Sequence, residues 1–142
     1  MPLMTEEVAA QLKDEFARLA NPVRLAVFSQ ALADPESEQV RRLMEELAAL
    51  DSRISVEAYN FVLDKEKVES LHIARIPAIA VMGAEKDYGI RMYGLPSGYE
   101  FGTLIEAILD VSRGDSGLAE ETRAGLKELA RDVHIQVFST PT

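Results

Sequence analysis

The segment Val23-Arg-Leu-Ala-Val-Phe-Ser29 constrains the fold most, because its apolar side chains would line both faces of a strand. A strand buried on both faces belongs in the interior of an α/β sheet that is covered by helices on its two sides. An amphipathic helix is expected just before it, over 5–19, with Thr5 as its N-cap and a stop at Asn21-Pro22. These features predict a layered α/β domain with residues 23–29 at its centre.

After this strand, the sequence predicts a helix between two strands and then two strands joined by a short turn. Asp34-Pro35 opens a second helix, because aspartate caps free backbone amides and proline fits the first helical position. The strands on either side of that helix form a parallel pair with a right-handed crossover, and a strand that begins at Pro77 then turns back as a hairpin. This order predicts a four-stranded mixed sheet flanked by helices on both faces. The expected helices lie over 5–19, 35–50, 65–71 and 99–112, and the expected strands over 23–29, 54–58, 77–82 and 90–93.

After Gly117 the pattern starts again. A helix is expected over 118–131 and a strand over 133–139, and Val133-His-Ile-Gln-Val-Phe-Ser139 shares four positions in register with residues 23–29. An internal repeat of this kind indicates a second structural unit that has only begun. We therefore expect a first domain over 1–115, followed by the first helix and strand of a second unit over 116–142.

The composition excludes several kinds of function. The chain contains no cysteine, so it can form neither disulfides nor thiolate metal sites and has no cysteine nucleophile. Its net charge of −9 disfavours binding to nucleic acids and to anionic membranes, whose partners carry Lys and Arg. His72 and His134 are far apart and are expected to be structural surface residues, so no metal and no cofactor are predicted. With no signal peptide and no membrane-spanning run expected, the predicted location is the cytoplasm.

Three segments carry a resemblance to a known family: 88–101, 108–113 and 137–142. The chain resembles the protein disulfide oxidoreductases, which are built from two tandem thioredoxin-fold units. The N-terminal double-thioredoxin domain of the alkyl hydroperoxide reductase flavoprotein is similar in plan. The resemblance implies a thioredoxin-like fold and a parent protein that exchanges thiols and disulfides. It also implies that the segment ending at Thr142 is followed by Cys-Pro-Tyr-Cys, the active site of the second unit.

The resemblance fails where the first unit of the family often carries a Cys-x-x-Cys. The matching positions here are Asp34, Pro35, Glu36 and Ser37. A helix N-terminus lowers the pKa of a cysteine and so favours the reactive thiolate, whereas here the same field would stabilise a capping carboxylate. Ser37 is a conceivable nucleophile, but no histidine base is apparent beside it. No catalytic residue is therefore predicted. By resemblance, the bond between Ile76 and Pro77 is expected to be cis and to line a groove for an extended peptide.

Two surface features have open interpretations. The acidic run Asp34, Glu36 and Glu38 fits a solvated helix start or a patch for a basic partner. The segment 95–98, flanked by Tyr93 and Tyr99, fits a turn that defines the fold or a docking loop.

Three functions remain open for the chain itself. The first is a redox-inactive N-terminal unit of a thiol–disulfide oxidoreductase, with the missing second unit as its partner. The others are a stand-alone module that binds a protein or peptide without reacting, and a dimerisation module that pairs through the C-terminal strand.

Overall fold

Strand β1 (Val23–Ser29) lies in the interior of a four-stranded sheet with the order β2-β1-β3-β4. The computed structural model describes residues 1–30 and 34–140. β1 pairs in parallel with β2 (Ile54–Asn60) and antiparallel with β3 (Ala78–Gly83), and β4 (Ile90–Tyr93) completes the hairpin with β3. The predicted mixed sheet is confirmed, with strand bounds that differ from the expected ones by at most two residues at either end.

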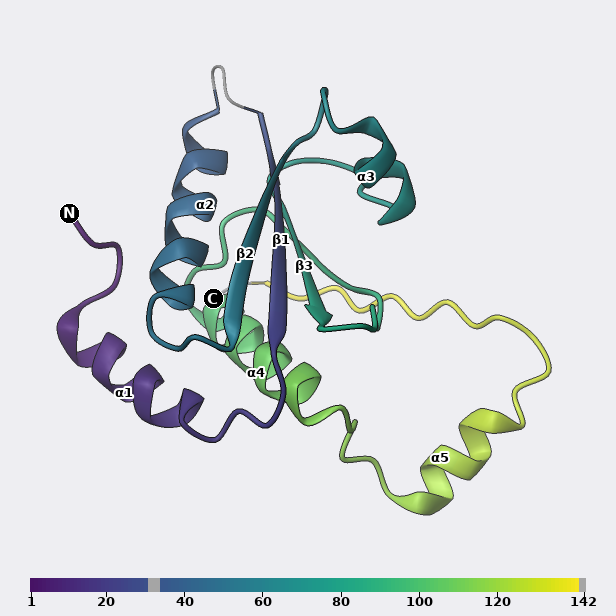
Figure 1. Cartoon of the computed structure of the whole chain (residues 1–142). Helices are drawn as coiled ribbons and strands as arrows, with labels where there is room; N and C mark the ends of the chain where they lie inside the picture. Colours follow the sequence, from purple (N-terminus) through teal and green to yellow (C-terminus); the bar gives the residue numbers. More distant parts are fainter. Residues whose placement is uncertain (31–33, 141–142) are drawn as a thin grey trace.

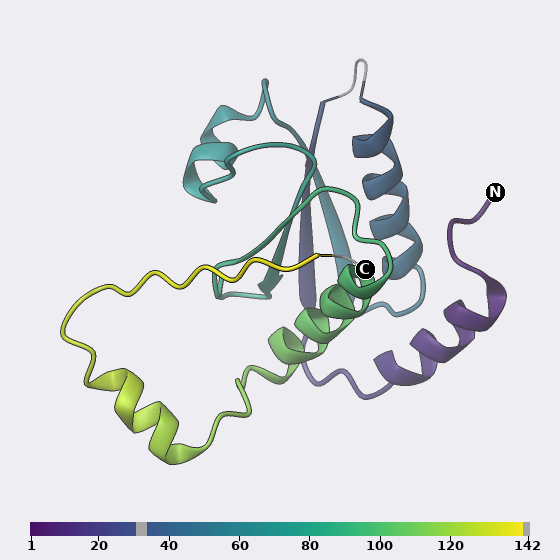
Figure 2. The same cartoon turned by 180° about the vertical axis from the view of Figure 1, so that it is seen from behind.

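Helices cover both faces of this sheet, as predicted (Figures 1 and 2). The larger core lies on the face where Val23, Leu25 and Val27 point, and the smaller core lies on the opposite face with Ala26 and Phe28. Because side chains alternate along a strand, β1 contributes fully buried side chains to both cores. The helices of the first face are α1 (Glu6–Phe16), α2 (Pro35–Ala48) and α4 (Tyr99–Arg113), and α3 (Lys65–Ser70) lies on the second.

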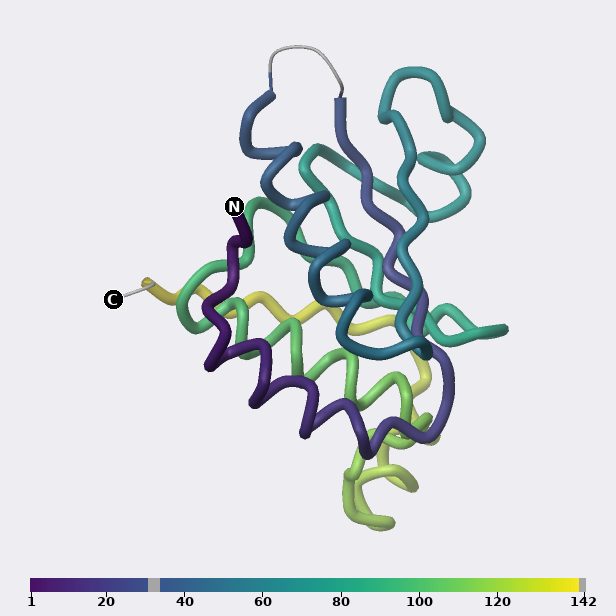
Figure 3. The backbone as a smooth tube through the Cα atoms, turned by 60° about the vertical axis from the view of Figure 1, so that its left-hand side comes forward, coloured from purple at the N-terminus to yellow at the C-terminus, as the bar shows by residue number. Residues whose placement is uncertain are grey.

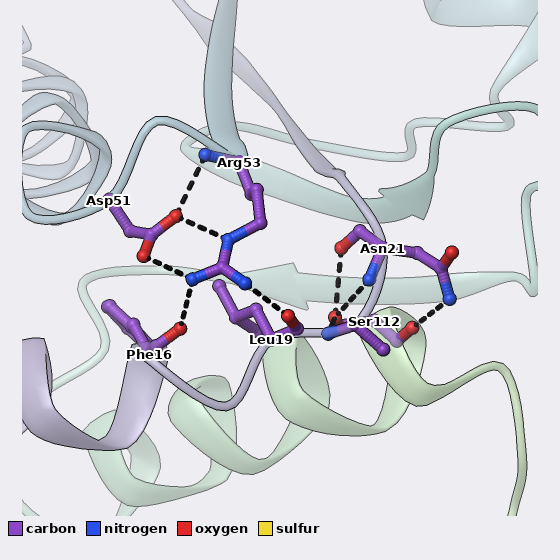
Figure 4. Close-up of polar contacts among 7 residues, drawn as sticks. Phe16, Leu19, Asn21, Asp51, Arg53 and Ser112 are labelled. Atoms are coloured by element: carbon purple, nitrogen blue, oxygen red, sulfur yellow. Dashed lines mark hydrogen bonds and ion pairs between the residues drawn. The ribbon is translucent and has the colours of Figure 1, made fainter.

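Helix α1 is joined to the sheet by a half-buried cluster of polar contacts around Arg53 (Figure 4). The Arg53 guanidinium donates to the Phe16 carbonyl at 2.9 Å, to the Leu19 carbonyl, and to both oxygens of Asp51 at 2.8 and 2.7 Å. The carbonyl groups at the end of a helix lack the usual partners within the helix. The arginine therefore binds the Phe16 carbonyl, which also accepts the Leu19 amide at 3.0 Å, and the Leu19 carbonyl just beyond the helix. The side-chain hydrogen bonds from Arg53 lower the pKa of Asp51 to about 2.

Ser112 joins the end of α4 to the segment that leads into β1 (Figure 4). Its side chain accepts from the Ala20 and Asn21 amides at 2.9 and 3.0 Å and donates to the Asn21 carbonyl at 2.8 Å. The residue is only 1% exposed. One hydroxyl therefore satisfies three backbone groups between α1 and the central strand.

The C-terminal segment differs from the prediction. The helix α5 (Glu120–Lys127) is shorter than expected, and residues 133–139, expected to be a strand, pair with no strand in the part of the chain that is described. The whole segment is exposed. Helix α5 lies apart from the first sheet, and the chain that follows it turns back in the direction of the sheet (Figures 1 and 2). The physical reason is that helices gain most of their stability from packing and a strand needs a neighbour to bond to. Residues 141–142, the last two of the family-like segment 137–142, lie outside the described residues.

We expect Ser112→Ala to destabilise the domain by about 1–3 kcal/mol, because it leaves two amides and a carbonyl without their protein partner. The free energy of unfolding in urea measures the effect. Ser52→Ala, at an exposed turn position, is the matched control and is expected to change little. Equal stability of the two variants would show that water replaces the Ser112 hydroxyl at no cost.

Candidate functional site

The N-terminus of α2 contains the four residues, Asp34 to Ser37, that the sequence resemblance matches to a Cys-x-x-Cys. Asp34 is the N-cap, and its carboxylate accepts the Ser37 amide at 3.3 Å. Pro35 occupies the first turn, where its missing N–H costs no helical hydrogen bond. The Ser37 hydroxyl donates to the second oxygen of Asp34. Residues 31–33, which lead into this cap, lie outside the described residues.

The contacts of Asp34 favour its ionised form. The Ser37 hydroxyl, with the Ser37 and Glu36 amides, holds the pKa of the Asp34 carboxyl below its ordinary value. Ser37 is 1% exposed and its hydroxyl is bonded to Asp34, so it cannot reach a substrate in solution. The site therefore presents a fixed negative charge at the helix N-terminus and no accessible nucleophile.

The loop after β4 connects this helix start to the region of Pro77. Glu36 accepts the Leu95 amide at 3.2 Å, and the neighbouring Gly94 amide donates to the Pro77 carbonyl at 2.9 Å. The start of α2 and Pro77 are thus each joined by one hydrogen bond to the segment 94–95. The Ile76–Pro77 peptide bond is cis.

The peptide group next to this proline is open. Neither the N–H nor the C=O of Ile76 has a hydrogen-bond partner within the described residues. Arg75 lies over the Tyr93 ring at 4.2 Å, and the Tyr93 hydroxyl accepts the Ala74 amide at 3.2 Å. These contacts hold the chain on the N-terminal side of Ile76 against β4. The arrangement leaves one donor and one acceptor that an extended chain can pair with.

The two histidines lie on exposed parts of the surface, His72 after α3 and His134 in the C-terminal segment. No group of three or more residues with metal-binding side chains occurs among the described residues. No helix in the described ranges is long and apolar enough to cross a membrane.

Sequence reasoning missed two contacts of this site. The link from Glu36 to Leu95 joins residues far apart in the sequence, and the open peptide group of Ile76 belongs to the backbone. Neither leaves a pattern in the sequence. A turn at 95–98 was foreseen, but not that its first residue is bonded to α2.

Sheet order, helix placement and the proline before β3 together define a thioredoxin-like fold. No protein-family model matches the chain. A relative named "NADH dehydrogenase" from Bacillus subtilis is 27% identical over 140 residues, which cover 99% of this chain and 25% of that protein. The chain spans about a quarter of the length of the curated relatives it matches.

Solved structures agree with this assignment. The NTD_N/C domain of the alkylhydroperoxide reductase AhpF from Enterococcus faecalis superposes with a TM-score of 0.78 at 27% identity, over 87% of this chain and 59% of that one. A protein disulfide oxidoreductase from Aeropyrum pernix gives 0.78 at 27% identity, over 88% and 55%. The resemblance predicted from the sequence is confirmed: the chain is a thioredoxin-like unit similar to those of these oxidoreductases.

We expect the double variant Asp34→Cys/Ser37→Cys to form an internal disulfide on mild oxidation, because an N-cap and the third residue after it lie within bridging distance. The thiol introduced at position 34 is expected to have a pKa below its ordinary value, because it faces a helix N-terminus. The pH dependence of alkylation of the Asp34→Cys variant measures this pKa, with Arg18→Cys at an exposed position as the control. Identical alkylation profiles for the two single variants would contradict the expectation.

Proposed function

We propose that the chain is the redox-inactive first thioredoxin-like unit of a larger thiol–disulfide oxidoreductase, in which cysteines of a second unit carry the exchange chemistry. The observation that carries this proposal is the contrast in burial between the two copies of the internal repeat. The same apolar pattern occurs in both copies at a constant spacing, but only the first copy has a core to occupy.

Six apolar side chains of the first copy have an apolar counterpart 110 residues later in the second copy. The six in the first copy are at most 5% exposed, whereas the exposure of their counterparts ranges from 52% for Leu126 to 89% for Phe138. Burial of one such side chain stabilises a protein by about 1.5–3 kcal/mol. A second unit built around residues 118–139 would supply that burial, as the first sheet does for residues 8–29. The matched pairs are Phe16 and Leu126, Leu19 and Leu129, Val23 and Val133, Leu25 and Ile135, Val27 and Val137, and Phe28 and Phe138.

The second copy does not fit the place of β1 in the first sheet. Gln136 matches Ala26, which is fully buried in the smaller core. An amide buried there would lack hydrogen-bond partners, which costs free energy. This mismatch supports a separate second sheet over an exchange of strands between two copies of the first unit.

The side chains of the first unit support the part of the proposal that makes it redox-inactive. Thiol–disulfide exchange requires a thiolate to attack a sulfur atom. The chain has no cysteine, and α2 begins on an ionised carboxylate that is already bonded to Ser37. In this proposal the first unit is a rigid frame, and its partner is the second unit.

The test is to read the gene beyond the codon for Thr142 and to compare amide hydrogen exchange in residues 1–142 with that in the full gene product. We expect codons for Cys-Pro-x-Cys and a second domain. We also expect the amides of 133–139 to be unprotected in the fragment and strongly protected in the full product, because they then pair within a sheet. A stop codon directly after Thr142 would falsify the proposal. Protection that depends on protein concentration in residues 1–142 alone would favour the dimerisation module instead.

The open peptide group of Ile76 favours a second candidate function, binding of an extended peptide without reaction. Its N–H and C=O have no partner within the described residues. Backbone pairing of this kind is a common way of holding an extended peptide.

A titration of the isotope-labelled chain with an unstructured Ser/Val peptide tests this candidate. Chemical-shift changes are expected at the amides of Ile76, Gly94 and Leu95. The matched control is the same peptide methylated on every backbone nitrogen, which cannot donate to the Ile76 carbonyl. Equal shifts with both peptides, or none with either, would rule out backbone pairing at this group.

A further inference from the structure

A furrow follows the seam between α1 and α4, on the outer side of the larger core. The two helices run side by side in the same direction (Figure 3), and three adjoining hollows of about 470, 340 and 410 Å³ follow one another along them. Val8 and Phe101 line both the first and the second hollow, and Glu15 and Glu106 line both the second and the third. The hollows therefore form one continuous depression.

The chemistry of the furrow changes along its length in a fixed order. The first end is apolar, with Val8 at 36% exposure beside Phe101, Leu43 and Leu95. This end includes residues 95–98, the segment for which the sequence left a docking loop open. The middle carries the carboxylates of Glu15 and Glu106, one on each helix, and the far end carries Arg18 and Arg113.

The charged groups of the furrow differ in their partners, and the Glu15 carboxylate accepts a hydrogen bond from the Gln11 side-chain amide at 3.5 Å. Glu15 and Glu106 make no ion pair within the described residues, and Glu15 is half-buried against the helix seam. The Arg18 guanidinium makes no hydrogen bond or ion pair in the same ranges, whereas Arg113 pairs with Asp110. Three carboxylates of α2, in the same helical layer, do have partners: Glu38 and Glu45 pair with Arg41, and Glu46 accepts the Leu3 and Met4 amides.

We infer that this furrow is the docking site for an amphipathic helix of a partner protein. Four turns of helix match the length of α4, since 15 residues span about 22 Å. The partner helix places an apolar turn on Val8 and Phe101, a Lys or Arg between Glu15 and Glu106, and an acidic residue toward Arg18. Burial of an apolar stripe in a groove gives affinity, and the order of charges fixes the direction of the helix. A second copy of the chain is disfavoured as the occupant, because its net charge of −9 opposes approach to these carboxylates.

This inference concerns a surface separate from Ile76 and from the C-terminal segment, so it stands or falls independently of the proposed function. The probes are two fluorescein-labelled helical peptides of about 16 residues with the same leucine stripe. One carries lysines at the central polar positions, and the other carries glutamates there. Fluorescence anisotropy with the full chain is expected to show binding of the lysine peptide and little binding of the glutamate peptide.

The decisive variant is Glu15→Lys/Glu106→Lys. It is expected to weaken binding of the lysine peptide by about tenfold or more and to gain binding of the glutamate peptide, because the sign of the central contact is reversed. Glu120→Lys/Glu121→Lys in α5 makes the same change in net charge away from the furrow and is expected to leave both affinities nearly unchanged. Circular dichroism checks that both variants keep their helices.

Three results would overturn the inference. Equal loss of binding in the two double variants would show a response to net charge alone. Equal binding of both peptides by the unmodified chain would show no recognition of charge order. Sedimentation that reveals a dimer, abolished by Glu15→Lys/Glu106→Lys, would assign the furrow to a second copy of the chain.

Discussion

The burial of β1 on both faces is the constraint on which the rest of the structure depends. The strand is hydrogen-bonded on one side to β2 and on the other to β3, and its side chains enter both cores. A strand in this position needs a helical layer above and below it, which α2 and α4 supply on one face and α3 on the other. The polar contacts of Arg53 and Ser112 lie at the end where the chain enters β1, and they fix α1 and α4 relative to it. The furrow between α1 and α4 depends on these contacts, because they hold the two helices side by side.

The start of α2 keeps the physical setting of a redox site with different chemistry. The helix N-terminus attracts negative charge whether that charge is a thiolate or a carboxylate. Asp34 caps the helix in this field, and the buried Ser37 hydroxyl donates a hydrogen bond to it. Glu36, in the same turn, accepts the amide of Leu95 in the loop after β4. The comparison with the oxidoreductases therefore concerns the fold and its geometry, while the side chains at these four positions belong to a structural cap.

The fold was predictable because its signals are local. The apolar alternation of 23–29, the Asp34-Pro35 helix start and the hairpin after Pro77 each follow from short patterns, and their order leaves few topologies. The predictable part of the site was the identity of the residues at the cysteine positions. Its contacts were not predictable, because Glu36 meets Leu95 and Ser112 meets Asn21 across many residues of intervening chain. The strand expected over 133–139 shows a second limit of prediction from the sequence. The alternating pattern indicates a preference for extended backbone, but a strand forms only where a neighbouring strand is present to pair with it.

The carboxylate at the start of α2 also has a thermodynamic consequence. In a unit that carries a Cys-x-x-Cys, the oxidised and reduced forms differ in folding free energy, and stability is linked to the redox potential of the surroundings. The cap built from Asp34 and Ser37 has no such second form. Because the unit contains no cysteine, formation or reduction of an internal disulfide does not contribute to its folding free energy.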